Sequence, residues 1–270
     1  MKKLNIFCTS IKYYKILDKL PKYISKIGLG ELGFPSNWYN EKKGKNISHL
    51  NKYYGELTGI YWIWKNVLKN LDKNDLIGNC HYRKLWLNKK YEDKQKGSSE
   101  SLFKNLLDEK NSLLEDQEIF QVQPINFNNK NLLEDYEIIH KNDCLEKSIL
   151  FLDPKLQNSF KSHLLGKTLF PLNMFITTPN KFEDYCKTIF PWLDKCYEYC
   201  LKNDLCNDYN IRLPAFLAER FTSFWFSQYP TSNFSYARLG NFHLSNHVNT
   251  FINPIKMPFT FRMYPTLHRY

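Results

Sequence analysis

Apolar residues between positions 46 and 68 recur with the period of a helix. Their spacings alternate between four and three residues, so they line one helical face: Leu50, Tyr54, Leu57, Tyr61, Trp64 and Leu68. We therefore predict one long helix whose apolar face packs on the core. Glu56 and Thr58 fall beside that face, and Asn46 or Ser48 can cap the first turn by accepting from free backbone N–H groups.

Other apolar patterns predict strands and helices in alternation. Short apolar runs predict strands at residues 3–9, at 118–124, at 170–178 and from Leu76 onward. Longer segments predict helices at residues 102–114, 182–201 and 212–226. His140 and Asp143 are expected just before or at the start of a further helix. Strands separated by helices are typical of an α/β layer fold.

The strand that begins at Leu76 runs directly into a polar and basic segment. This segment holds four candidate side chains: His81, Tyr82, Arg83 and Lys84. An α/β sheet binds its ligand where its strands end, so these residues are candidates for ligand binding. Thr9 closes the first strand in the same way and is a candidate nucleotide contact. A solvated loop is the alternative interpretation of both segments.

Residues 27–45 contain turn-forming residues and little periodicity, which predicts a surface loop able to fold over a ligand. The glycines of GLGELG at residues 28–33 imitate a dinucleotide-binding fingerprint. The third glycine falls one place early, and we expect neither a strand immediately before this segment nor a helix after it. The match is therefore rejected.

Composition favours one globular α/β domain with helical additions. The chain has 270 residues, 16% aromatic residues and a net charge of +11. The charge favours a polyanionic or phosphate-bearing partner, or an anionic membrane surface. The excess of lysine in a Lys/Asn/Ile-rich sequence is also explained by solvated surface positions. We expect a single domain over residues 1–270, with a basic and aromatic tail from about residue 236.

Apolar runs and cysteines bear on where the protein works. No apolar run approaches the roughly 20 residues of a membrane span, and the polar N-terminal segment does not resemble a signal peptide, so we expect a cytoplasmic location. Seven scattered cysteines, an odd number, favour reduced thiols. Cys196, Cys200 and Cys206 lack a second pair at metal-ligand spacing, which favours buried structural thiols.

Four segments, in order, resemble a family of bacterial glycosyltransferases from capsule and lipopolysaccharide O-antigen gene clusters that was long described only as a domain of unknown function. The segments are YYGELTGIYWIWKN, IGNCHYRKLW, LNMFITTPNKFEDYC and LAERF. The resemblance implies a GT-A-like nucleotide-binding fold and sugar transfer from a nucleotide-sugar, with galactofuranose transfer assigned to some members. Lys84 stands where a second arginine is usual, which keeps the charge but loses the planar fork.

A glycosyl transfer needs positive charge at the leaving diphosphate and a base for the acceptor hydroxyl. Glu219 on a late helix is the expected base, and Asp143 is the second candidate; an ion pair of Glu219 with Arg220 or Arg212 is the alternative. The expected donor-binding residues come from the strand ends and the shared segments: Thr9, Asn46, Glu56, His81, Tyr82, Arg83, Lys84, Asn173 and Arg262. Glu56 can orient His81 or Arg83, or lie exposed on the back of its helix. The tail with Arg262 can close over the diphosphate or bind a membrane.

No acidic triplet follows the strand that ends at His81, where many GT-A enzymes bind a divalent metal. The acidic pair Asp72 and Asp75 lies at the opposite end of that strand. We therefore expect His81, Arg83 and Lys84 to neutralise the diphosphate directly, without a metal, although His81 could ligate one.

Taken with these residues, the resemblance implies an inverting transferase that passes a sugar from a UDP-sugar to a lipid-linked capsular or O-antigen glycan at the inner face of the inner membrane. Two other classes stay open: a nucleic-acid-binding module, motivated by the net charge of +11 and the aromatic residues, and a non-catalytic carbohydrate-binding subunit. A phosphotransferase or nuclease is disfavoured, because the sequence has neither a P-loop nor clustered acids for two metals.

Overall fold

The first strand of the chain lies in the middle of a mixed sheet. The computed structural model describes residues 2–30, 33–88, 103–234, 236–239 and 251–252. Along the sheet the strand order is β10-β6-β9-β4-β1-β2-β3. The strands of this path are β1 (Leu4–Ser10), β2 (Ile24–Gly28), β3 (Tyr39–Asn40), β4 (Leu76–His81), β6 (Phe120–Val122), β9 (Phe175–Thr177) and β10 (Ser232–Phe234).

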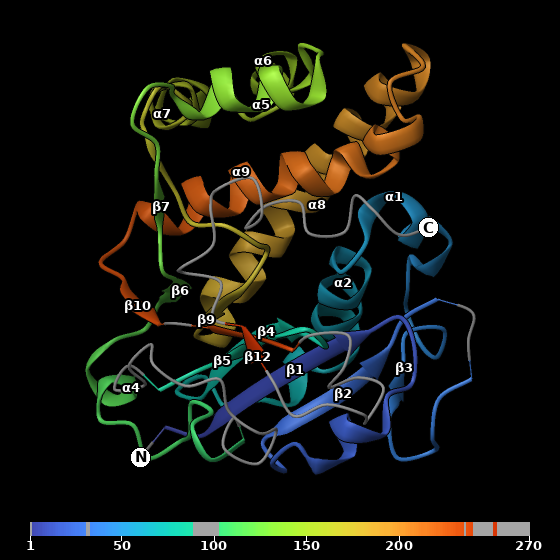
Figure 1. Cartoon of the computed structure of the whole chain (residues 1–270), viewed down its shortest axis with the longest axis vertical. Helices are drawn as coiled ribbons and strands as arrows, with labels where there is room; N and C mark the ends of the chain where they lie inside the picture. Colours follow the sequence, from blue (N-terminus) through green and yellow to red (C-terminus); the bar gives the residue numbers. More distant parts are fainter. Residues whose placement is uncertain (1, 31–32, 89–102, 235, 240–250, 253–270) are drawn as a thin grey trace.

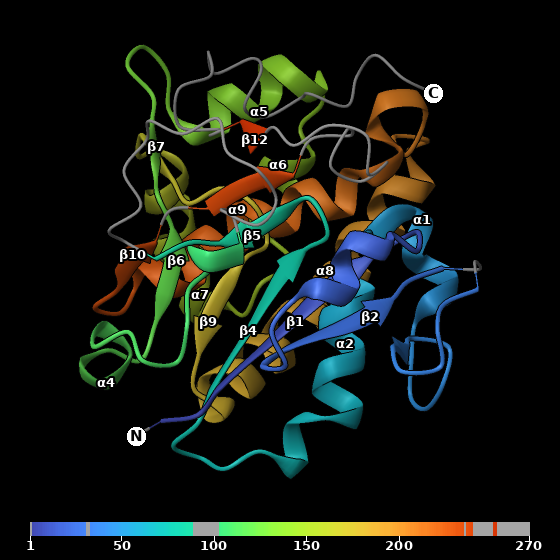
Figure 2. The same ribbon diagram turned by 60° about the horizontal axis from the view of Figure 1, so that its bottom comes forward.

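Strand direction decides which chain ends meet at one edge of the sheet. β1 is parallel to both β2 and β4, whereas β9 is antiparallel to β4. The start of β9 therefore lies beside the carboxyl end of β4, as the view in Figure 2 shows. Residues before Phe175 and residues around His81 are thus brought to the same edge.

Further strands extend the sheet beyond β4. β5 pairs with β4 and with β11, and β11 pairs with β12, all in antiparallel fashion. A separate two-stranded sheet joins β7 and β8. The bounds are β5 (Lys84–Trp86), β7 (Ile125–Asn126), β8 (Thr168–Leu169), β11 (Tyr236–Leu239) and β12 (Phe251–Ile252).

Helices cover one face of the sheet in two layers (Figure 1). The inner layer consists of α1 (Asn51–Tyr54), α2 (Leu57–Asn66), α8 (Pro179–Lys202) and α9 (Leu213–Ser227). The outer layer, beyond α9, consists of α5 (Leu132–His140), α6 (Cys144–Ile149) and α7 (Pro154–Leu164). Shorter helical segments are η1 (Lys15–Lys19), η2 (Ser48–Leu50), η3 (Leu68–Asn70), η4 (Asp208–Arg212) and α4 (Leu113–Asp116).

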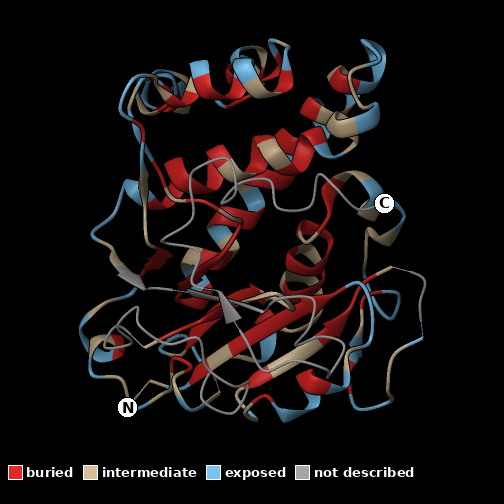
Figure 3. Cartoon of the chain, viewed as in Figure 1, coloured by how far each residue is buried: buried red, intermediate tan, exposed pale blue. Residues whose placement is uncertain are grey.

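Each face of the sheet has its own apolar core, because successive side chains of a strand point to opposite faces. Phe7 and Ile77 pack with the helices, whereas Ile6 and Cys80 belong to the core on the other side. Buried residues run along the sheet and along α9 in Figure 3. The alternation places His81 on the same face as Ile77, which is the helical face.

The α/β architecture expected from the sequence is confirmed, as are the strands at β1, β4 and β6 and the helices α8 and α9. The single helix expected over residues 46–68 is wrong, because the chain breaks at Gly55 between α1 and α2. Gly55 has φ +55° and ψ −130°, a backbone conformation that favours glycine. The apolar face is kept on both sides of the break, since Tyr54 and Leu57 are fully buried.

The helix expected at residues 102–114 is also wrong for most of that range. Leu106 instead forms an isolated bridge with Leu87, and Asp108 accepts from the backbone N–H of Lys110 at 2.8 Å. Asp and Asn side chains compete with helical hydrogen bonds in this way. The strand expected over residues 170–178 is shortened to β9, because Leu172 has φ +68° and leaves the extended conformation.

The loop expected over residues 27–45 is only partly at the surface. Trp38 and Glu41 are buried, and β2 ends at Gly28, immediately before the other glycines. One of the reasons for rejecting a dinucleotide fingerprint, the lack of a preceding strand, is therefore wrong. The segment that follows leads to β3 through a turn, as far as the described residues show.

Two general expectations concern membranes and cysteines. Among the helices of the described chain, none combines the length and the apolar character that crossing a bilayer requires. All seven cysteines are free thiols, and six are buried.

Candidate functional site

Basic side chains of the β4–β5 hairpin stand at the carboxyl ends of the central strands. His81 pairs with Thr9 of β1 on one side and with Lys84 of β5 on the other. Tyr82 and Arg83 form the two-residue turn between them. The strand end predicted from the sequence is therefore a tight hairpin, which holds the imidazole and two cations on one short segment.

The start of α2 brings a carboxylate to this hairpin. Glu56 follows the break at Gly55 and is the residue immediately before the helix. A helix N-terminus favours a nearby negative charge, because its backbone N–H groups point outward. The break thus aims the first turn of α2, and with it Glu56, at the edge of the sheet where β4 ends.

Arg212 reaches the same place from η4, just before α9. Its guanidinium lies against Gly55, and a Cβ on residue 55 would stand only 2.5 Å from its Nη2 atom. Gly55 therefore does two things: it adopts the positive φ, and it leaves room for the arginine. Arg212 was not among the expected site residues, because nothing in the local pattern before α9 distinguishes it from a surface arginine.

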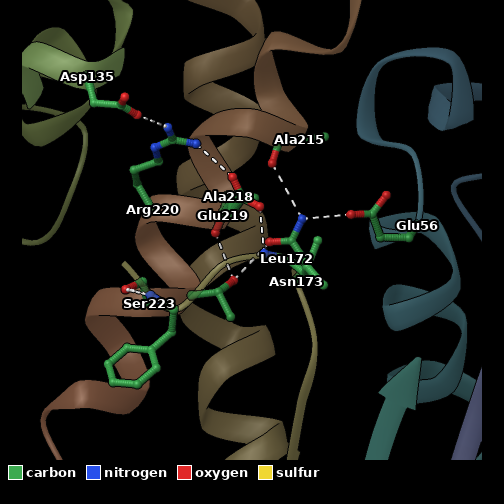
Figure 4. A network of polar contacts seen from close by, with 11 residues as sticks. Glu56, Asp135, Leu172, Asn173, Ala215, Ala218, Glu219, Arg220 and Ser223 are labelled. Atoms are coloured by element: carbon green, nitrogen blue, oxygen red, sulfur yellow. Dashed lines mark hydrogen bonds and ion pairs between the residues drawn. The ribbon is translucent and has the colours of Figure 1, made fainter. Parts of the chain in front are cut away.

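Asn173 connects the start of β9 to Glu56. Its Nδ2 atom donates to Glu56 Oε1 at 2.9 Å, and Figure 4 shows this bond at one end of a polar network. The side chain is only 2% exposed. Asn79 of β4 holds the backbone at residues 173–175. Its Nδ2 donates to the carbonyl of Asn173, and its Oδ1 accepts from the N–H of Phe175 at 3.1 Å. Asn79 was missed, although asparagine is unusual in a buried strand.

Charges around Glu56 keep its carboxyl ionised. Burial alone would raise the pKa of Glu56, but the charges of His81 and Arg212 and the hydrogen bond from Asn173 outweigh burial and lower the pKa to about 2. His81 is neutral near pH 7, so Arg212 and Asn173 carry this effect under physiological conditions.

The imidazole of His81 is neutral because of its surroundings. Burial lowers its pKa to about 4, and the charges of Lys84, Arg83 and Arg212 act in the same direction, against the carboxylate of Glu56. All four groups are therefore close enough to His81 to influence its titration. We call Glu56, His81, Arg83, Lys84 and Arg212 the sheet-end cluster.

An aromatic pair flanks this cluster. The ring of Tyr82 stacks on Tyr14, with centroids 5.2 Å apart and planes 8° from parallel. The guanidinium carbon of Arg83 lies 5.0 Å from the centroid of Tyr82. This contact holds the arginine at the hairpin turn and places an aromatic surface beside the cations.

Two other expected donor-binding residues have structural hydrogen bonds. Thr9 is 2% exposed, and its hydroxyl donates to the carbonyl of Cys80 at 3.2 Å. Asn46 accepts from the N–H of Ser48 at 3.2 Å and donates to the carbonyl of Gly44 at 2.9 Å. The helix cap expected of Asn46 or Ser48 is wrong, because Ile47 and Leu50 occupy the cap positions of η2 and α1 and neither caps through its side chain. The roles of Thr9 and Asn46 toward a donor stay predictions. Arg262 lies outside the described residues.

The two expected catalytic acids lie in different surroundings. Glu219 of α9 accepts from the N–H of Leu172 at 2.6 Å and from Arg220 at 2.7 Å. Asp143 lies at the start of α6 in the outer helical layer, with Lys147 at 3.9 Å and the hydroxyl of Tyr199 at 3.4 Å. Asp143 is therefore not brought to the sheet-end cluster. Glu219 is linked to it, because Glu219 binds Leu172 and the next residue, Asn173, binds Glu56.

The cluster offers few ligands for a divalent metal. Glu56 and His81 are one carboxylate and one imidazole, and cations surround both. Among the residues that the structure describes, no three His, Cys, Asp or Glu side chains gather as a metal site, the cysteines of α8 included. Three or more such ligands are usual for a protein-bound metal, so these residues do not fit one.

Comparison with known proteins finds one family and one solved structure. The family model described as "Domain of unknown function (DUF4422)" matches residues 6–230. The apo structure of WbbM, described as a bifunctional glycosyltransferase, superposes with a TM-score of 0.69 at 20% sequence identity. The match covers 89% of this chain and 46% of that one, so this chain spans about half the length of WbbM. At this identity the likeness shows a shared fold. No curated protein sequence matches the chain.

Proposed function

The chain belongs to the DUF4422 family, and from this premise and the sheet-end cluster we propose that it is a nucleotide-sugar-dependent glycosyltransferase. It transfers a sugar, with galactofuranose as one candidate, from a UDP-sugar to a growing capsular or lipopolysaccharide O-antigen glycan. The acceptor is lipid-linked, and the enzyme works at the inner face of the inner membrane. The structural similarity to WbbM, which is described as a bifunctional glycosyltransferase, supports this class of reaction.

The cations gathered in the sheet-end cluster carry the proposal. Arg83, Lys84 and Arg212 all act on the imidazole of His81, which is itself neutral near pH 7. A diphosphate bound there is attracted by these cations, and the position at the ends of β1 and β4 is where α/β sheets bind such ligands. Tyr82 supplies a ring on which a base or a sugar can stack.

The residues of the cluster divide the work of the reaction. The cations stabilise the charge that develops on the leaving UDP, and this stabilisation is largest in the transition state. Inversion follows from a single displacement, in which the acceptor attacks from the side opposite the diphosphate. We further propose that the cations take the place of a divalent metal.

Ligand-induced thermal stabilisation tests this function. UDP, GDP, CMP and ADP are compared with and without manganese, because a ligand that binds only the folded state stabilises it by about 2.7 kcal/mol at 100 times its Kd. We expect a selective shift with UDP that manganese does not change. His81→Ala and Arg83→Ala should lose most of the shift. Lys187→Ala is the matched control, because this exposed lysine pairs with Glu183 on α8, 2.9 Å away.

Two results would overturn the proposal. A protein that no nucleotide stabilises, but that short single-stranded nucleic acid does, is a nucleic-acid-binding module. A protein that is stabilised by glycans alone, and that never releases UDP from a UDP-sugar, is a carbohydrate-binding subunit.

A further inference from the structure

Glu56 is the carboxylate of the sheet-end cluster that keeps an oxygen available. Its Oε1 accepts from Asn173, and within the described part of the chain no second side chain donates to this carboxylate. The side chain is partly exposed. Glu219 differs, because each of its two oxygens already accepts a hydrogen bond, one from Leu172 and one from Arg220.

We propose that Glu56 is the catalytic base and that Glu219 is a positioning residue, which holds Glu56 through Leu172 and Asn173. This inference rests on the proposed function, and it differs from the expectation that Glu219 is the base. In the step, the acceptor O–H proton moves to Oε2 of Glu56 while the acceptor oxygen bonds to the anomeric carbon. The bond from that carbon to the β-phosphate oxygen breaks, and its electron pair leaves with UDP.

The first link of the positioning runs from Glu219 to a strained turn. Leu172 has φ +68°, a left-handed conformation that is unfavourable for leucine and open to glycine. Its N–H donates to Oε1 of Glu219 at 2.6 Å. A hydrogen bond to a carboxylate is among the stronger ones in proteins, so it can hold the turn in this conformation.

The second link runs from the turn to Glu56. Asn173 comes directly after Leu172, and its amide is held on several sides (Figure 4). Its Oδ1 lies 3.1 Å from the hydroxyl of Thr222, and its Nδ2 lies 3.4 Å from the carbonyl of Ala215. The amide therefore has one orientation in which an N–H points at Glu56, and that N–H leaves Oε2 turned away from Asn173.

Glu219 itself is fixed by buried charge. Nη1 of Arg220 donates to its Oε2 at 2.7 Å, and Nη2 of the same guanidinium donates to Asp135 at 3.1 Å. Arg220 and Asp135 are 1% and 0% exposed. A carboxylate bound in this way is a rigid support for the turn, and each of its oxygens is already engaged by a donor of the protein.

Glu56→Gln tests the base. Glutamine still accepts from Asn173 through its carbonyl oxygen but cannot take a proton. Turnover is measured as UDP release in the presence of acceptor glycan, with UDP-galactofuranose, UDP-galactose, UDP-glucose and UDP-N-acetylglucosamine as donors. We expect kcat to fall by about 10²- to 10⁴-fold, with the thermal shift by UDP retained. A Glu56→Gln protein that keeps its kcat overturns the assignment.

Glu219 is tested by a conservative change and by a rescue. Glu219→Gln keeps an acceptor for Leu172 and should retain most of kcat, whereas Glu219→Ala should lose about 10- to 100-fold. Adding Leu172→Gly to Glu219→Ala should restore kcat, because glycine adopts the positive φ without support. Leu172→Gly alone is the control. Equal losses in Glu219→Gln and Glu219→Ala, without rescue, would show that Glu219 is the base.

Failure of the inference and failure of the function give different results. A wild-type protein that is not stabilised by UDP and releases none from any of the four donors removes the proposed function, and the base assignment with it. If the wild-type protein is stabilised by UDP and releases UDP from a donor, and the Glu56→Gln variant is fully active, only the inference is removed. Amide hydrogen exchange at Leu172 reports the turn without any substrate, and protection that survives Glu219→Ala contradicts the positioning role.

Discussion

Two groups of charged residues lie close together in this protein, and they differ in balance. In the buried charge network, formed by Lys130, Asp135, Glu219 and Arg220, each charge faces an opposite one at 2.7 to 3.1 Å. In the sheet-end cluster, by contrast, two of the cations are not held in ion pairs with described residues. Within the described ranges, neither Arg83 nor Arg212 has a carboxylate oxygen within ion-pair distance.

The difference shows which charges serve the fold and which serve a ligand. A buried pair that is mutually satisfied holds its neighbours in one arrangement, and removing one partner leaves an uncompensated charge. Arg83 and Arg212 lie near each other without an ion pair in the described part of the chain, and like charges repel, so their gathering has a functional explanation in an anionic ligand. The two groups meet at Asn173, where the balanced network supports the unbalanced one.

The strongest way to break this comparison is to remove one charge from each group. Arg220→Met leaves Asp135 and Glu219 without their shared cation, and we expect the free energy of unfolding to fall by about 3–5 kcal/mol. Arg83→Met should change it by less than about 0.5 kcal/mol while removing the UDP shift. Urea unfolding of both variants measures the contrast, and equal stability losses would contradict it.

A smaller effect is expected at the break before α2. Gly55→Ala forces a side chain into φ +55° and against Arg212, 2.5 Å from its Nη2. Strain of this kind costs about 1–3 kcal/mol, and the displaced guanidinium should also weaken binding of UDP. Gly33→Ala is the control, because its Cβ would meet no atom within 4 Å. Thermal unfolding with and without UDP separates the two consequences.

Lowering the pH also tests the two regions, because buried histidines in each should make stability depend on pH. Burial lowers the pKa of His81 and of His163 to about 4 and that of His140 to about 3, whereas an unfolded imidazole titrates near 6.5. The unfolded state therefore binds more protons, and stability should fall as pH drops from 6.5 through 4, by at most about 1.4 kcal/mol per pH unit for each histidine. The carboxyl of Glu56, with a folded pKa of about 2, adds a further loss only between 4.5 and 2.

Two variants assign this pH dependence to the two regions. His140→Gln and His81→Gln should both flatten the fall in stability, measured by urea unfolding at pH 7, 5.5 and 4.5. His140 is buried against Asn210 in the helical layers, 2.8 Å away, so its variant should keep the UDP shift. His81→Gln should reduce that shift. A full UDP shift in His81→Gln would contradict a role of His81 in binding the ligand.

Local patterns predicted the parts of the fold that depend on contiguous residues. The apolar runs of β1 and β4 and the long amphipathic helices α8 and α9 are visible in the sequence, because burial repeats along a single element. The same reasoning failed at Gly55 and Leu172. Their positive φ values are set by packing against distant residues, and a periodic pattern passes through such a break without a signal.

The sequence by itself determined the α/β class and the basic segment after β4. It gave an ion pair of Glu219 with Arg220 or Arg212 only as the alternative to a catalytic role, and the structure shows the pair with Arg220. Tertiary structure alone decided that Arg212 joins His81, that Asn173 reaches Glu56 across 117 residues, and that Glu219 supports Leu172. The physical reason is the separation along the chain of the residues that interact. Periodicity and charge order are properties of neighbours along the chain, whereas these contacts form only when antiparallel β9 brings its start to the carboxyl end of β4.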